Sequence, residues 1–151
     1  MTADDRPEAG RPQALDAQCR QAASLLRLNP GDIAAPVGLY SQGIVAPAAG
    51  RWLHVSGQVG MLPDGTVPAD FSAQAQNAWH NVFRILAAAG MGPEHLVKIT
   101  SFVTDPAHLA LFAPVRARFL GEARPASTLV VVRALARAEW LVEVEALAWA
   151  P

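Results

Sequence analysis

The clearest pattern of hydrophobic and polar positions is a run of apolar residues at three- and four-residue spacing between Asp70 and Ala89. This spacing places the apolar side chains on one face of a helix, and such a face packs against a core. Asp70 precedes the run as a candidate N-cap, and Gly90 follows it as a residue suited to end a helix. The run comprises Phe71, Ala75, Ala78, Val82, Ile85, Leu86 and Ala89.

Other segments have the apolar content of strands, and a second helix separates the later ones. Arg51–Ser56 alternates between polar and apolar positions, which is typical of a half-buried strand. Residues 127–132 are almost continuously apolar, so we expect both faces of that strand to be covered. Residues 104–106, Thr-Asp-Pro, indicate the start of the second helix, which we expect to end before Gly121. The other predicted strands are residues 39–45, 95–103 and 140–149.

The N-terminal part leaves two alternatives open. Residues 13–27 fit a short helix, and they equally fit a loose extension that ends in a strand near residues 25–28. With that strand the order is β-β-β-α-β-α-β-β, which favours an α+β fold whose mixed sheet carries both helices on one face. We expect copies of the chain to cover the other face. We therefore predict a partly disordered extension over residues 1–30 and one domain over residues 31–151.

The composition agrees with a globular domain that associates with itself. Hydrophobic residues make up 52% of the chain and charged residues 17%, so it is more apolar and less charged than a typical monomer. A net charge of −1 argues against a nucleic-acid partner, and no apolar run reaches the ~20 residues of a membrane span. The single Cys19 and an N-terminus without an apolar segment favour a cytoplasmic location.

Few residues carry recognisable chemistry. The histidines lack the spacing of metal ligands, so we expect no metal site, and no phosphate-binding loop is present. Glu143 and Glu145 alternate with apolar residues in the last predicted strand. A carboxylate there is either a general acid or base, or half of an ion pair at a subunit interface. Tyr40, the only tyrosine, either borders a pocket or packs in the core.

Six segments in order resemble motifs of the Rid family, the RidA-like or YjgF-like reactive-intermediate deaminases. Residues 38–43, Gly-Leu-Tyr-Ser-Gln-Gly, are similar to its Gly-Pro-Tyr-Ser-Gln motif. Residues 53–58, Leu-His-Val-Ser-Gly-Gln, are similar to its Phe-Val-Ser-Gly-Gln strand, and residues 124–128 lie where the family has Pro-Ala-Arg-Ser. The remaining segments are residues 76–90, 97–105 and 141–148. The resemblance covers about residues 33–150.

The resemblance implies a chorismate-mutase-like fold and a homotrimer with clefts between its subunits. It also implies hydrolysis of reactive imines and enamines to 2-oxo acids and ammonia, without a metal or organic cofactor. By position, Glu143 is identified as the glutamate that orients the attacking water, and Tyr40 and Gly57 as residues that line the cleft. Leu129 takes the place usually held by a cysteine whose backbone contacts the substrate.

Ser127 stands where active members of the family have the arginine that binds the substrate carboxylate. A bidentate arginine–carboxylate contact is directional and charge-assisted, and losing it for a buried pair costs about 2–5 kcal/mol. Serine donates one hydrogen bond and supplies no positive charge. Arg116, Arg124, Arg133 and Arg137 are alternative sources of that charge, or else they are solvated or interface arginines.

These residues are compatible with three functions. The first is a hydrolase of an imine, enamine or related C–N substrate, with Glu143 catalytic and with Tyr40, Gly57, Ser127 and Leu129 binding the substrate. The second is a trimer that binds a small metabolite in its clefts without catalysis. The third is a trimer that serves as an interaction surface, with the N-terminal extension docking a partner.

Overall fold

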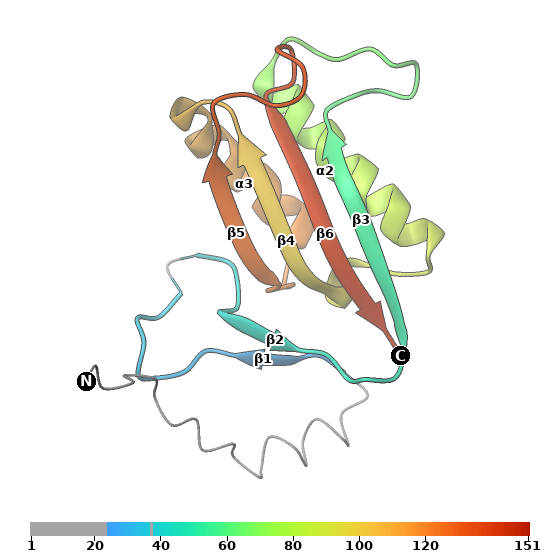
Figure 1. The fold of residues 1–151 in the computed structure, drawn as a ribbon, viewed down its shortest axis with the longest axis vertical. Helices are drawn as coiled ribbons and strands as arrows, with labels where there is room; N and C mark the ends of the chain where they lie inside the picture. Colours follow the sequence, from blue (N-terminus) through green and yellow to red (C-terminus); the bar gives the residue numbers. More distant parts are fainter. Residues whose placement is uncertain (1–23, 37) are drawn as a thin grey trace, which may run out of the picture.

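The computed structural model describes residues 24–36 and 38–151, and Figure 1 shows their arrangement. The elements follow the predicted order β-β-β-α-β-α-β-β, with a short 3₁₀ turn before β4 and another before α3. The strands are β1 Leu26–Leu28, β2 Gly43–Val45, β3 Arg51–Val59, β4 Leu96–Val103, β5 Ala126–Val131 and β6 Val142–Ala150. The helices are α2 Phe71–Ala88 and α3 Leu109–Leu120.

The main sheet is mixed, as the sequence predicted. Its strand order is β3-β6-β4-β5, and β6 runs antiparallel to both of its neighbours. β4 and β5 are parallel, and α3 provides the crossover that a parallel pair requires. β1 and β2 form a separate antiparallel pair at one end of the sheet (Figure 1).

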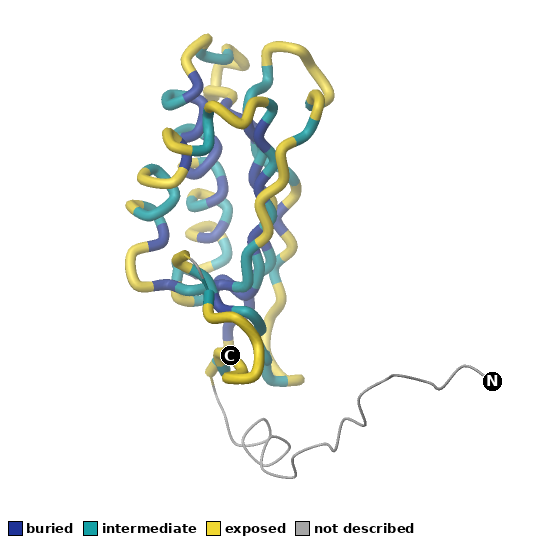
Figure 2. The backbone as a smooth tube through the Cα atoms, turned by 90° about the vertical axis from the view of Figure 1, so that its left-hand side faces the viewer, coloured by how far each residue is buried: buried dark blue, intermediate teal, exposed yellow. Residues whose placement is uncertain are grey.

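Both helices lie on the same face of the sheet, and the core lies between the two layers (Figures 1 and 2). Trp79 of α2 is fully buried there, and its ring stacks on Phe112 and Phe119 of α3 at centroid distances of 6.4 and 6.0 Å. Burial of one such side chain contributes on the order of 1.5–3 kcal/mol, so this cluster fixes the two helices against each other.

The helix ends form where the sequence predicted them. The Asp70 side chain accepts a hydrogen bond from the amide of Ala73 at 2.8 Å, which satisfies one of the free N–H groups of the first turn. Gly90, directly after α2, has a φ of 69°. Residues with a side chain rarely adopt this backbone conformation, so glycine suits the position. Neither described helix has the length and apolar character needed to cross a membrane.

Three expectations need correction or completion. Leu129, Val130 and Val131 are 37%, 39% and 39% exposed, so one chain alone does not cover this strand, and cover by a second copy stays a prediction. The reason is that β5 is an edge strand, paired with β4 only. The strand predicted at residues 39–45 begins only at Gly43, because the chain bends before it. The terminal strand near residues 25–28 is observed as β1, whereas residues 13–23 lie outside the described residues.

Candidate functional site

Gly57 and Glu143 are in direct contact between β3 and β6. The register of these strands shifts between Val55 and Gln58, so Gly57 lies in a bulge. A Cβ atom on residue 57 would lie 1.7 Å from Oε1 of Glu143. The carboxylate therefore occupies space that is free only because residue 57 is glycine. This contact brings together two of the predicted site residues.

The Glu143 side chain borders a cavity of about 390 Å³, which we call the Glu143 pocket. Within the described part of the chain, no hydrogen bond or ion pair joins the Glu143 carboxylate to another residue. Its oxygens are therefore available to accept hydrogen bonds from a water molecule or a ligand. The pocket is lined by Gly57, Met61, Leu62, Asn81, Trp140 and Glu143, among others.

Tyr40 lies in the bend before β2, and this bend is attached to the start of β5. The amide of Ser41 donates to the carbonyl of Pro125 at 3.1 Å, and its hydroxyl donates to the carbonyl of Arg124 at 2.6 Å. Ser41 also forms a β-bridge with Ala126, the residue before Ser127. These contacts bring the segments that carry Tyr40 and Ser127 together. We call Leu39, Tyr40, Ser41, Arg116 and Ser127 the Tyr40 edge.

Arg116 of α3 is the arginine whose guanidinium reaches this edge. Its Nη2 donates to the carbonyl of Leu39 at 2.8 Å. The side chain is half-buried, and burial lowers the pKa of Arg116; the nearby charge of Arg124 lowers it further, whereas Tyr40 raises it. No carboxylate of the described residues forms an ion pair with Arg116. Its charge is therefore available to a bound anion.

The other three arginines have different surroundings. Arg124 donates to the carbonyls of Gly121 and Ala123, at 2.6 and 2.8 Å, which holds it at the C-terminal end of α3. The guanidinium of Arg137 lies over the ring of Trp140, 5.4 Å from its centroid, and Trp140 lines the Glu143 pocket. Arg133 is exposed between β5 and β6. Arg116 is thus the alternative charge that the structure places beside Tyr40.

Within one chain the predicted residues form two groups that do not meet. Glu143 pairs with Phe102 of β4, whereas Ser127 pairs with Ile99 of the same strand. Two strand spacings across the sheet and three residues along it separate Glu143 from Ser127 by roughly 14 Å. Ile99 is buried under the helices, so Ser127 faces the helical side, while Glu143 lies beside Gly57 at the other edge. Leu129 follows on β5, on the same side as Ser127.

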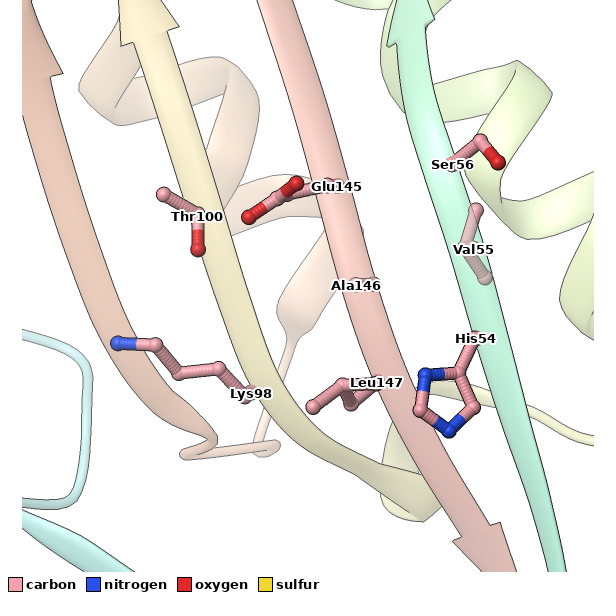
Figure 3. Close-up of a pocket in the computed structure, with 8 residues that line it drawn as sticks. All are labelled: His54, Val55, Ser56, Lys98, Thr100, Glu145, Ala146 and Leu147. Carbon is pink, nitrogen blue, oxygen red and sulfur yellow. The ribbon is translucent and has the colours of Figure 1, made fainter.

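A second cavity, of about 260 Å³, lies on the sheet face that carries no helix (Figure 3). Glu145 lines it, together with His54, Lys98 and Thr100. In Figure 3 the Glu145 carboxylate points toward Thr100, whereas the Lys98 side chain extends toward β5. Lys98 Nζ donates there to the hydroxyl of Thr128. None of the predicted site residues lines this cavity. The two glutamates of β6 therefore line different cavities, Glu145 this one and Glu143 the Glu143 pocket.

The sequence analysis missed Trp140 and Gln74 as residues of the site. Trp140 was included only as the first residue of a strand, yet its half-buried side chain lines the Glu143 pocket. Gln74 is 1% exposed although it is polar, and it stands within the apolar stripe of α2. A glutamine at such a position was the available signal, because a buried amide must have hydrogen-bond partners. Among the described residues, no group of His, Cys, Asp and Glu could hold a metal ion.

Comparison with known proteins identifies the family. The model of the family described as Endoribonuclease L-PSP matches residues 32–150, and the chain belongs to this family. A RutC family protein of Pyrococcus horikoshii is 34% identical over 116 residues, which cover 76% of this chain and 89% of that protein. A putative reactive intermediate deaminase of Escherichia coli, TdcF, is 33% identical over 116 residues, covering 74% and 87%.

Solved structures agree with the fold and with the resemblance to Rid proteins. A protein of the conserved Rid family from Yersinia pestis has a TM-score of 0.74 and 31% identity, covering 83% of this chain and 98% of that one. TdcF of Escherichia coli, solved with bound serine, has a TM-score of 0.63 and 28% identity, covering 83% and 99%. The predicted family and the mixed α+β fold with two helices are therefore confirmed.

Proposed function

We propose that the protein is a RidA-like hydrolase that acts on an imine, enamine or related C–N substrate, in clefts between the subunits of a homotrimer with a chorismate-mutase-like fold. The observation that carries this proposal is the contact between Gly57 and Glu143. It places a carboxylate that has no partner among the described residues at a cavity large enough for a small molecule. Relatives described as reactive intermediate deaminases support the same chemistry.

Glu143 suits the water-handling role. Hydrolysis of an imine adds water to the C=N carbon, moves protons to the nitrogen, and then breaks the C–N bond to leave a carbonyl group and ammonia. Because the Glu143 oxygens have no partner among the described residues, one of them is free to accept a proton of the water as it attacks. The neighbouring Gly57 keeps the space beside this carboxylate open.

We place the cleft between subunits because the predicted site residues form two separate groups within one chain. Glu143 with Gly57 at one edge and Tyr40 with Ser127 at the other do not converge within one chain. A cyclic trimer brings one edge of each subunit against the opposite edge of the next, since its interfaces are heterologous. The exposed apolar residues of β5 favour such a contact. In this assembly Leu129 lies at the rim of the cleft, where its backbone contacts the substrate.

Arg116 supplies the positive charge that Ser127 lacks for an acidic substrate. Its guanidinium contacts the bend that carries Tyr40, and no described carboxylate neutralises it. Serine, the ligand bound to TdcF, carries a carboxylate, which supports an acidic substrate for relatives of this fold. The family description also names an endoribonuclease, but a chain with a net charge of −1 has little electrostatic attraction for RNA phosphates.

The proposal is tested by the release of 2-oxobutanoate from 2-iminobutanoate, which a dehydratase generates in the same reaction. Wild-type protein is expected to accelerate this release, and Glu143→Gln, which keeps the shape but not the charge, is expected to lose about 10²-fold or more of it. Glu145→Gln is the matched control, because Glu145 lies on the same strand but lines the other cavity. Equal rates for wild type and Glu143→Gln would refute the proposed role.

A second candidate is a trimer that binds a small metabolite without catalysis. The observation that favours it is Ser127 in place of the arginine, because without that contact less binding energy is available to hold a substrate in the reactive geometry. Absence of any rate acceleration, together with saturable binding of 2-oxobutanoate, would support this candidate. Robust hydrolysis of 2-iminobutanoate would exclude it.

A further inference from the structure

Trp140 carries a buried hydrogen-bond donor at the Glu143 pocket. Its side chain lines the same cavity as the Glu143 carboxylate, and its indole Nε1 is buried without a hydrogen-bond partner among the described residues. A buried donor that stays unpaired costs about 1–3 kcal/mol, so its position at a cavity calls for a partner that enters the cavity. The lining of the pocket thus includes an unpaired indole donor and a charged acceptor.

We propose that the indole N–H of Trp140 binds an acceptor atom of the substrate, a carbonyl oxygen or an imine nitrogen, beside the Glu143 carboxylate. The inference rests on the proposed function and adds to it a substrate-binding residue and the chemical group that this residue binds. Trp140 holds the neutral, polar end of the reacting bond, whereas Glu143 accepts a proton from the water. This division suits a C=N or C=O group, whose nitrogen or oxygen accepts a hydrogen bond.

A buried side chain fixes the backbone on both sides of Trp140. Gln74 Nε2 donates to the carbonyl of Glu139 at 2.9 Å, and Gln74 Oε1 accepts from the amide of Leu141 at 2.9 Å. Gln74 Nε2 also donates to the carbonyl of Pro68 at 2.7 Å, so the amide is held from a second direction. Gln74 is therefore a positioning residue, which acts through the segment that carries Trp140.

The close packing around Gln74 makes this attachment rigid. A Cβ atom on Gly60, the residue after β3, would lie 2.4 Å from the Cα of Gln74, so the chain approaches α2 here as closely as glycine permits. On the other side, the Arg137 guanidinium lies 5.4 Å from the Trp140 ring centroid, and the Trp140 amide donates to the Arg137 carbonyl at 3.1 Å. These contacts hold the ring at the cavity before a ligand arrives.

An apolar part of the pocket wall favours a particular kind of substituent on the ligand's acceptor group. Met61 and Leu62 line it and are each 39% exposed, so they present apolar surface to a ligand. A short apolar chain next to the C=N or C=O group fits this wall. The wall thus favours a ligand whose acceptor group carries a small aliphatic chain.

Trp79 provides an internal control. Its Nε1 is also buried without a partner among the described residues, but Trp79 is fully buried among the rings of α2 and α3 and none of the described cavities touches it. Trp149 Nε1 already donates to the carbonyl of Ala49 at 2.9 Å. Only the Trp140 indole combines a free donor with a cavity in the described part of the chain.

The test is a titration of the full-length, ¹⁵N-labelled protein with 2-oxobutanoate, followed through the indole N–H signals of its four tryptophans. The signal that disappears in Trp140→Phe is Trp140. We expect it to move and saturate, while the Trp79 signal stays in place. Trp140→Phe keeps the ring over which Arg137 lies, and it is expected to bind 2-oxobutanoate about tenfold more weakly because one hydrogen bond is lost.

Two results would overturn the inference. One is a Trp140 signal that stays in place up to the highest soluble concentration of 2-oxobutanoate. The other is Trp140→Phe with unchanged affinity. Hydrolysis of 2-iminobutanoate is measured separately: a moving Trp140 signal without turnover rejects the proposed function and leaves this binding residue in place. For Gln74→Leu we expect the affinity to fall as in Trp140→Phe, with the Trp140 signal shifted already in the free protein.

Discussion

Gly57→Ala is the substitution whose effect follows most directly from the structure. The new methyl carbon would lie 1.7 Å from Oε1, 2.6 Å from Cδ and 2.9 Å from Cγ of Glu143. Contacts below about 3 Å between such atoms are not tolerated, and the hydrogen bonds between β3 and β6 limit how far the backbone moves. The Glu143 side chain must therefore rotate away, and its carboxylate leaves the position beside residue 57.

The expected loss of activity in Gly57→Ala is much larger than the expected loss of stability. Rotation of a partly exposed side chain to a poorer rotamer costs about 0.5–1.5 kcal/mol, which lowers Tm by roughly 6 °C at most. A displacement of about 1 Å or more of a catalytic group lowers turnover by about 10²-fold. We therefore expect Gly57→Ala to fold, to melt slightly below wild type, and to lose most of its hydrolysis of 2-iminobutanoate.

The assay is the release of 2-oxobutanoate, combined with a double-mutant cycle. If residue 57 acts through Glu143, adding Gly57→Ala to a Glu143→Ala variant should not lower the rate further. Gly43→Ala is the matched control, because a Cβ atom there meets only Leu28 side-chain atoms, the nearest at an ordinary 3.6 Å. Wild-type turnover by Gly57→Ala, or a full further loss in the double variant, would refute this reasoning.

Three further variants test separate parts of the structure. Asp70→Ala removes the side chain that accepts from the Ala73 amide and is expected to destabilise the protein by about 1 kcal/mol in urea unfolding, whereas Asp70→Asn should lose less. Phe112→Ala empties a position that is 1% exposed and stacks on Trp79, so the free energy of unfolding should fall by about 3–5 kcal/mol; a loss below 1 kcal/mol would mean that this cluster is not the core. Ser127→Arg adds a cation at the Tyr40 edge and should lower KM for 2-iminobutanoate about tenfold, and an unchanged KM would show that the substrate carboxylate binds elsewhere.

Much of the fold was predictable because local patterns determine it. The apolar stripe of α2, the Asp70 cap and the positive φ at Gly90 all depend on residues close together in the sequence. The exposure of β5 could not be predicted in this way. A continuous apolar run indicates that a strand needs covering, but the run does not say whether the cover comes from the same chain or from a neighbour.

The candidate site was also predictable only as far as local sequence motifs define it. The family motifs identified Glu143 and Gly57, and the bulge in β3 then explained why they belong together. Trp140 and Gln74 escaped notice because their roles depend on contacts between residues far apart in the chain. The bonds from Gln74 to Glu139 and Leu141 span more than sixty residues, and no local pattern encodes them. Which arginine stands near Tyr40 likewise depended on how α3 packs.

Mixing two inactive variants tests the central claim, a site shared between neighbouring subunits, most directly. Glu143→Gln disables the Glu143 pocket, and Arg116→Gln disables the Tyr40 edge, so each variant alone should hydrolyse 2-iminobutanoate poorly. After the two are unfolded together and refolded as mixed trimers, about a quarter of the clefts should contain two intact halves, and about a quarter of wild-type activity should return. A mixture no more active than the mean of the two variants would contradict the account.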